Sequence, residues 1–253
     1  MTTETPIPQH QQVEDEPTPG QGGRLSTAMG PVTWLRALAL GLAFALLGGA
    51  IGWTIASRDD DPLSATDIGF MQDMDYHHTQ AIAMSKALLY KDGIDRNLNG
   101  FAEEILSDQR FEQGLMNAIM ARFGHPVDPY SDDPEAGTAM GWMGPEVPRD
   151  EMAGMATEEQ MDELVAAEGD EAEALWIALM TEHHLGGLHM ADYEARHGSD
   201  EAVRNLAQAM VKNQRSEVID LNRFRTRMEL PIPEGFADPM KDQRLNPLSL
   251  NED

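Results

Sequence analysis

Two copies of one methionine and histidine pattern constrain this chain more than any other feature. The first copy lies at residues 74–84 and the second at residues 180–190, so every matched position is shifted by 106 residues. The first copy lacks glycine and proline and its apolar residues recur every three or four positions, which predicts an α-helix with the histidines on one side. The matched residues are Met74, His77, His78 and Met84 in the first copy and Met180, His183, His184 and Met190 in the second.

The repeat continues into the helix predicted after each histidine pair. A glutamine and a glutamate three residues apart occur as Gln109 and Glu112 and again as Gln214 and Glu217, a shift of 105 residues. The repeated unit is therefore a helix hairpin, and neither hairpin can bury its apolar stripe alone. We predict an all-α domain over 62–229 in which two hairpins form a four-helix bundle. Repeat one covers 62–124, a methionine-rich crossover covers 125–169 and repeat two covers 170–229.

Three pairs of side chains have the spacing of a capping box, which marks the start of a helix. The pairs are Ser64 with Asp67, Thr157 with Gln160, and Asp170 with Glu173. Beyond the last predicted helix, residues 230–253 are rich in Pro, Asp and Asn, which predicts an extended C-terminal tail.

The N-terminal part of the chain predicts a membrane anchor. Residues 1–33 have little to bury and predict a disordered cytoplasmic tail. Residues 34–57 contain an uncharged run bounded by Arg36 and Arg58, and at about 1.5 Å per residue this run spans roughly 30 Å, enough for a single transmembrane helix. A cleaved signal peptide is the alternative, but the long polar lead-in favours the anchor. The positive charges before the span place the domain outside the cytoplasm, as a single-pass protein of the cell membrane.

Charge and cysteine content exclude several classes of partner and site. The formal net charge of −26 argues against nucleic acid as a partner, because two polyanions repel each other. The chain has no cysteine, which excludes disulfides and thiolate metal sites. Any chemistry with soft metals therefore depends on histidine and on the 17 methionines.

The paired histidines are the main candidates for a metal site. Imidazoles are costly to bury unless they are hydrogen-bonded, so their retention in both repeats indicates a use, and clustered neutral imidazole most often binds metal. The alternative is that they are packed helix residues satisfied by carbonyls or carboxylates. Imidazole with thioether and no thiolate favours copper, especially Cu(I). A di-iron centre is disfavoured, because the Glu-x-x-His motif of such bundles is absent at the pairs.

Two further groups of residues are candidates for supporting roles. The glutamines and glutamates of the repeat, Gln109, Glu112, Gln214 and Glu217, could hydrogen-bond the histidines and set their tautomers, or form only a polar stripe. The methionines of the crossover could supply extra copper ligands or fill gaps in the packing. These methionines are Met140, Met143, Met152 and Met155. No catalytic residue is predicted.

The motifs His-His-x-x-Ala-x-x-Met and His-His-x-x-Gly-x-x-Met, each preceded by Met, resemble the bacterial family named domain of unknown function 305. The resemblance covers about residues 62–229 and includes Gln-x-x-Glu on each following helix. It implies a ferritin-like four-helix fold, usually exported or membrane-anchored, with copper binding in some members. Gly187 stands where the second motif usually has Ala.

Three functions are compatible with these features. The first is a membrane-anchored, extracytoplasmic protein that binds copper for sequestration or delivery without catalysis. The second is an accessory subunit of a larger membrane complex, such as a respiratory one, in which the histidines only pack. The third, a ferritin-type oxidase, is disfavoured by the missing Glu-x-x-His motif.

Overall fold

The structure is a computed structural model, and it describes residues 62–130 and 137–250. The predicted cytoplasmic tail over 1–33 and the predicted transmembrane helix over 34–57 lie outside these residues. Within the described ranges, no helix combines the length and the apolarity that crossing a bilayer requires.

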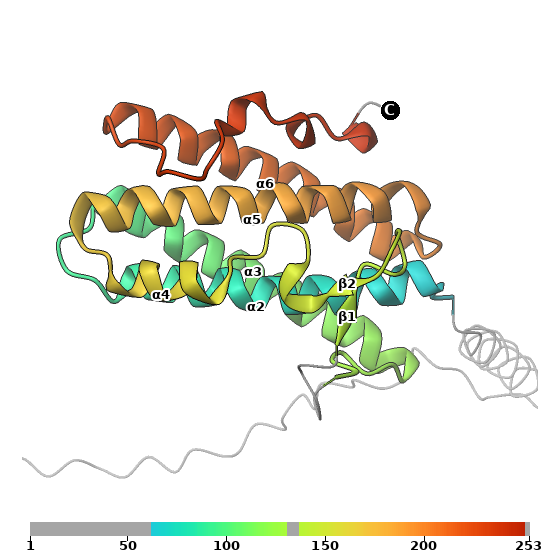
Figure 1. Cartoon of the computed structure of the whole chain (residues 1–253). Coiled ribbons are helices and arrows are strands. Elements are labelled where there is room, and N and C mark those ends of the chain that lie inside the picture. The colour runs from blue at the N-terminus through green and yellow to red at the C-terminus, as the bar shows by residue number, and fades with distance from the viewer. Residues whose placement is uncertain (1–61, 131–136, 251–253) are drawn as a thin grey trace, which may run out of the picture. The chain divides into compact units, whose positions relative to one another are not determined.

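Two pairs of long antiparallel helices form the domain (Figure 1). Helix α2 packs against α3 and α5, and α5 packs against α6. The prediction of an all-α bundle is thus confirmed in its main feature, a helical domain, while its ferritin-like character stays a prediction. The four helices are α2 (Ala65–Leu89), α3 (Arg96–Phe123), α5 (Gly169–His197) and α6 (Glu201–Arg227).

Local sequence signals place most of the helix ends. Both hydrogen bonds of the predicted capping box at Ser64 and Asp67 are present at the start of α2. Helix α3 ends at Gly124, whose φ of 77° lies in the left-handed region that glycine adopts without strain. The predicted capping box at Thr157 and Gln160 begins α4 (Glu158–Ala166).

The predicted capping box of Asp170 and Glu173 is wrong. Helix α5 begins at Gly169, so Asp170 already lies in the first turn. The Glu173 carboxylate instead accepts a hydrogen bond from the backbone N–H of Asp95, at 2.6 Å. A contact between the starts of α3 and α5 therefore takes the place of the local cap.

The crossover contains a small sheet that the sequence analysis did not predict. Strands β1 (Thr138–Ala139) and β2 (Val147–Pro148) pair antiparallel, and the 3-10 turn η2 (Arg149–Glu151) follows. The loop between the strands is attached to α2, because the Asp73 carboxylate accepts hydrogen bonds of 2.7 Å from the Met140 N–H and the Trp142 Nε1–H. A side chain of α2 thus determines where the crossover runs.

The C-terminal tail differs from the extended segment that was predicted. It forms the 3-10 turns η3 (Pro239–Lys241), η4 (Gln243–Leu245) and η5 (Leu248–Leu250). The side chains of Asp238 and Asp242 cap the first two of these turns, which explains why a segment rich in aspartate and proline does not stay extended.

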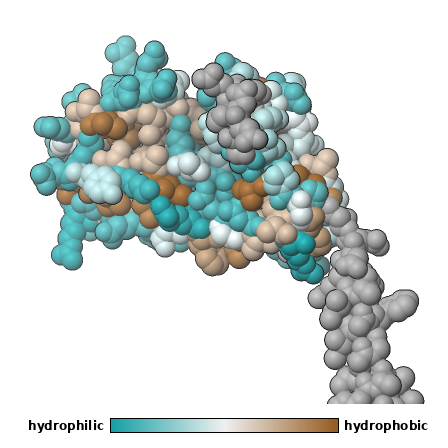
Figure 2. Space-filling model, turned by 90° about the horizontal axis from the view of Figure 1, so that it is seen from below, coloured by the Kyte–Doolittle hydropathy of each residue, from teal (hydrophilic) through white to brown (hydrophobic). Residues whose placement is uncertain are grey.

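The core consists of two clusters of buried hydrophobic residues. The first core cluster contains Phe70, Met74 and Met190, and the second core cluster contains Met84 and Met180. Each core cluster thus contains the first motif methionine of one repeat and the last motif methionine of the other. On the face shown in Figure 2, hydrophilic residues predominate and hydrophobic ones form scattered patches.

Candidate metal centre

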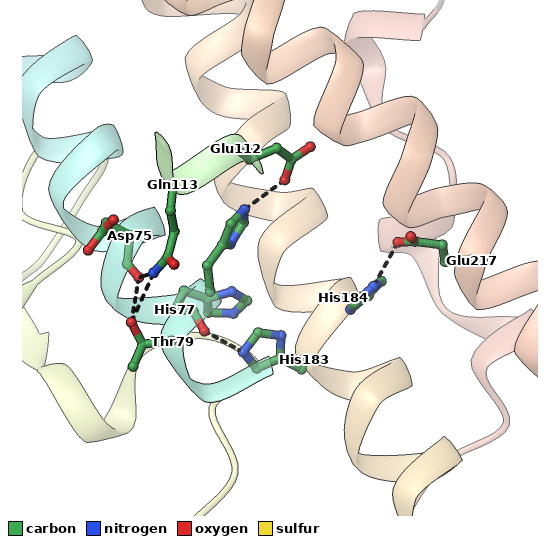
Figure 3. Close-up of polar contacts among 9 residues, drawn as sticks. Asp75, His77, Thr79, Glu112, Gln113, His183, His184 and Glu217 are labelled. Atoms are coloured by element: carbon green, nitrogen blue, oxygen red, sulfur yellow. Dashed lines mark hydrogen bonds and ion pairs between the residues drawn. The ribbon is translucent and has the colours of Figure 1, made fainter. Parts of the chain in front are cut away.

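The two histidine pairs lie in the interior of the bundle, on the facing helices α2 and α5 (Figure 3). None of the four residues is more than 1% exposed. Buried imidazoles must find hydrogen-bond partners or pay the cost of desolvation, so their contacts show how the site is built.

One histidine of each repeat pairs with a glutamate from the second helix of the same hairpin. His78 Nε2 lies 2.7 Å from Glu112 Oε2, and His184 Nε2 lies 2.8 Å from Glu217 Oε2. When the glutamate is ionised it can only accept, so the imidazole donates from Nε2. The two repeats therefore build the same contact.

The other histidine of each repeat bonds to backbone. His77 Nε2 lies 3.2 Å from the carbonyl oxygen of Ala153 in the crossover, and His183 Nε2 lies 2.9 Å from the carbonyl oxygen of His77. Carbonyl oxygens only accept, so both rings carry their proton on Nε2. The two rings stack, with centroids 3.6 Å apart and an angle of 29° between their planes.

The remaining nitrogen of every ring is free. All four Nδ1 atoms are buried, and none has a hydrogen-bond partner among residues 62–130 and 137–250. A buried acceptor without a donor costs about 1–3 kcal/mol, so four of them are an expensive arrangement for packing alone. A lone pair on Nδ1 with Nε2–H held by the protein is the state in which a histidine coordinates metal.

Burial keeps the imidazoles of His77, His78 and His183 neutral. It lowers the pKa of His77 and His183 well below 6.5, and the nearby histidines lower it further. Burial also lowers the pKa of His78 to about 3. For Glu112, burial first and the charge of Glu217 second raise the pKa to about 7. These three histidines therefore present neutral imidazole nitrogens, and the site disfavours protonated histidine.

The methionines of the repeated motif are all fully buried, two in each core cluster. In the crossover, Met152 is buried in the first core cluster, and Met140, Met143 and Met155 pack against it half-buried.

In the described part of the chain, no group of three or more His, Asp or Glu side chains is arranged to hold a metal ion. A centre here would need thioether ligands beside imidazole, and this donor set suits Cu(I) better than zinc or magnesium.

The predicted role of Gln109 and Gln214 is not seen. Both side chains are buried, but Gln109 Oε1 and both polar atoms of Gln214 have no partner among the described residues. The Gln214 amide lies against Gly187, where a Cβ would collide with its oxygen. Packing on the glycine therefore places this amide.

Sequence reasoning missed the contribution of the crossover backbone to the site. The Ala153 carbonyl has no side-chain signature, so only an indirect signal could have found it. That signal is Gly186-Gly187 in the middle of a predicted helix, since paired glycines there often mark the close approach of another backbone.

Solved structures of two related proteins resemble this chain. A DUF305 protein of Streptomyces coelicolor, described as secreted, is 31% identical over 67% of this chain and 96% of its own, with a TM-score of 0.58. A DUF305 fragment from Deinococcus radiodurans is 25% identical over 66% of this chain and 99% of its own, with a TM-score of 0.55.

A more distant likeness is to CopM, solved in Cu(I)-bound and Cu(II)-bound forms. In the Cu(I)-bound form it is 21% identical over 65% of this chain and 99% of its own, with a TM-score of 0.49, which is too low to bear on the site. No curated protein matches the chain. The family model for the domain of unknown function DUF305 matches residues 67–225, and this protein belongs to that family.

Proposed function

We propose that this protein binds copper as Cu(I) through the histidine pairs and the motif methionines, and that it sequesters or delivers the metal without catalysis. The observation that carries the proposal is the set of four buried imidazoles whose Nε2 atoms are engaged and whose Nδ1 atoms are free. This arrangement supplies neutral donors in a site that excludes water.

The chemistry of the donors selects the metal. Thioethers are soft ligands that do not titrate, and imidazole binds copper well, so the two together favour Cu(I) over harder cations. The glutamates each contact a histidine, which suits orientation of the ring. A ferritin-type oxidase would instead use its carboxylates to bind two iron ions, and we consider it the weaker alternative.

We further propose that the domain lies outside the cytoplasm and is anchored by residues 34–57. The uncharged run in this segment supports the anchor. The description of the Streptomyces coelicolor relative as secreted supports the location.

The test is Cu(I) binding by the full-length protein in detergent, measured anaerobically by competition with a chromophoric chelator. We expect at least one tightly bound equivalent, which should be lost when all four core histidines become Ala. A matched control replaces the exposed His189 and His197 by Ala and should bind as the unaltered protein does. Binding below one equivalent, or binding unchanged in the fourfold variant, would contradict the proposal.

Methionine variants provide a second test in case the variant with all four histidines replaced does not fold. Leucine has nearly the volume of methionine, so the exchange keeps the core but removes the sulfur. The pair Met74→Leu and Met190→Leu tests the thioethers of the first core cluster, and the pair Met84→Leu and Met180→Leu tests those of the second. At least one pair should weaken Cu(I) binding, and undiminished affinity in both would exclude the thioethers as ligands.

A further inference from the structure

Residues 152–156 of the crossover are here called the strap. The strap contacts both α2 and α5 beside the stacked histidines. Gln80 on α2 holds the strap with two hydrogen bonds to Ala156: its Nε2 donates to the carbonyl oxygen at 2.8 Å, and its Oε1 accepts from the N–H at 2.7 Å. Three residues earlier, the Ala153 carbonyl accepts from His77. The strap is thus attached to α2 at two points, both on the face that carries the histidines.

Two glycines allow the strap to lie directly on the backbone of α5. Gly154 has a φ of 83°, a conformation that residues with a side chain rarely adopt. A Cβ on it would lie 2.7 Å from the Glu182 carbonyl oxygen and 2.8 Å from that of His183. A Cβ on Gly186 would collide with the Ala153 carbonyl. The Ala153 carbonyl is therefore positioned by contact with the backbone of α5 on one side and by the hydrogen bonds between Gln80 and Ala156 on the other.

This geometry matters for His77 in particular. His78 and His184 are each oriented by a glutamate that the repeat duplicates. His77 has no such carboxylate, and its Nε2 contact is the carbonyl of the strap at 3.2 Å. Without that carbonyl, the ring could carry its proton on either nitrogen, because a neutral imidazole in solution populates both tautomers.

We propose that the strap is the positioning element of the metal centre: the Ala153 carbonyl fixes the Nε2–H tautomer of His77 and leaves Nδ1 ready for metal, and Gln80 is the positioning residue that holds the strap. The inference rests on the proposed function only for the binding of copper, because the contacts of the strap are seen in the structure itself. Gln80 touches no donor atom of the centre, so its influence passes through the backbone of the strap. Loss of an outer partner of a ligand histidine typically costs about 10- to 100-fold in metal affinity.

Two variants displace the strap, and two matched variants do not. Gln80→Leu removes both bonds to Ala156, and Gly186→Ala places a methyl group where the Ala153 carbonyl lies. The controls are on α3. Gln113→Leu breaks the hydrogen bonds of Gln113 to Asp75 and Thr79 on α2 but none to the strap (Figure 3). Gly114→Ala adds a methyl group that meets no atom within 4 Å among the described residues.

The first readout needs no metal. Long-range nitrogen–proton correlation spectra of the metal-free full chain distinguish the two neutral tautomers of a histidine by their ring nitrogen shifts. We expect His77 as Nε2–H in the unaltered protein and in both controls, and a mixture of tautomers in Gln80→Leu and Gly186→Ala. If Gly186→Ala does not fold, Gln80→Leu alone decides the outcome.

The second readout is the Cu(I) dissociation constant from chelator competition. We expect it to rise about 10- to 100-fold in the strap variants and to stay unchanged in the controls. A His77 ring that remains Nε2–H in Gln80→Leu, with unchanged copper affinity, would overturn the inference. If the tautomer shifts but no variant of the protein binds copper, the positioning by the strap is upheld and the proposed function is the part that fails.

Discussion

Acidification from about pH 7.5 to about pH 5 should remove about 4 kcal/mol of stability that His77 and His183 contribute to the metal-free protein, a loss that is measured against a variant without these two histidines. Both imidazoles are buried without a carboxylate partner, and burial lowers their pKa well below 6.5. In the unfolded chain the same groups take up protons below pH 6.5, whereas in the folded protein they do not. The contribution to stability is therefore complete above about pH 6.5 and falls as the pH drops below it.

The magnitude follows from proton linkage. One proton bound only by the unfolded state costs about 1.4 kcal/mol per pH unit. From the ordinary histidine pKa of about 6.5 down to pH 5, this gives about 2 kcal/mol for each residue, or about 4 kcal/mol for the two. Domains are typically stable by about 5–15 kcal/mol, so a contribution of this size should be large enough to measure.

The pair of His78 and Glu112 should contribute little over this range. The lowered pKa of His78, about 3, makes the folded state lose stability on acidification. The raised pKa of Glu112, about 7, has the opposite effect, because the folded protein binds this proton before the unfolded chain does. Each effect is about 2 kcal/mol at pH 5, so the two nearly cancel.

Urea unfolding followed by circular dichroism at both pH values measures the effect. The double variant His77→Gln with His183→Gln should lack this contribution, so the stability of the unaltered protein relative to this variant should fall by about 4 kcal/mol between the two pH values. The double variant His78→Gln with Glu112→Gln serves as the control and should keep the contribution. The same change in stability with pH in the unaltered protein and in the first variant would refute the reasoning.

Two further predictions concern other buried contacts of the bundle. Burial first and Asp67 second raise the pKa of Glu194 to about 9, so the folded protein should lose stability as the pH rises to this value. Glu194→Gln cannot ionise and should therefore melt at a higher temperature than the unaltered protein above about pH 9.5. Equal melting losses in both proteins would contradict this assignment. Gly187→Ala places a methyl group where the Gln214 amide lies, so it should gain less stability in urea unfolding than the about 1 kcal/mol that helix propensity alone would give. In the presence of Gln214→Ala the same change should gain more, and strict additivity of the two changes would argue against the contact.

The helices and the glutamate partners were accessible from the sequence because they depend on side chains at regular spacing. Ser64 and Asp67 form a cap within one turn, so the start of α2 follows from local chemistry. Glu112 and Glu217 follow their histidine pairs at nearly the same distance, 34 residues after His78 and 33 residues after His184, and the structure places each against a histidine. Duplication made these contacts visible as a pattern.

The remaining features depend on contacts between distant backbone groups. The carbonyl of Ala153 carries no side-chain signal, and the Glu173 carboxylate accepts a hydrogen bond from Asp95 rather than capping its own helix. The strands β1 and β2 are two residues each, too short for an alternating pattern. Such features follow from tertiary packing, which a single sequence does not reveal.

The strap also makes the two repeats unequal in a way that duplication alone would not. His77 donates to the crossover, whereas its counterpart His183 donates to the backbone of His77 itself. His183 is therefore oriented by α2, and α2 is attached to the strap by Gln80. Displacing the strap should disturb His77 directly and His183 only through the movement of α2, while the histidines that pair with glutamates keep their partners. If metal binds at the stacked rings, its affinity thus depends on the crossover, which has no counterpart in the repeat.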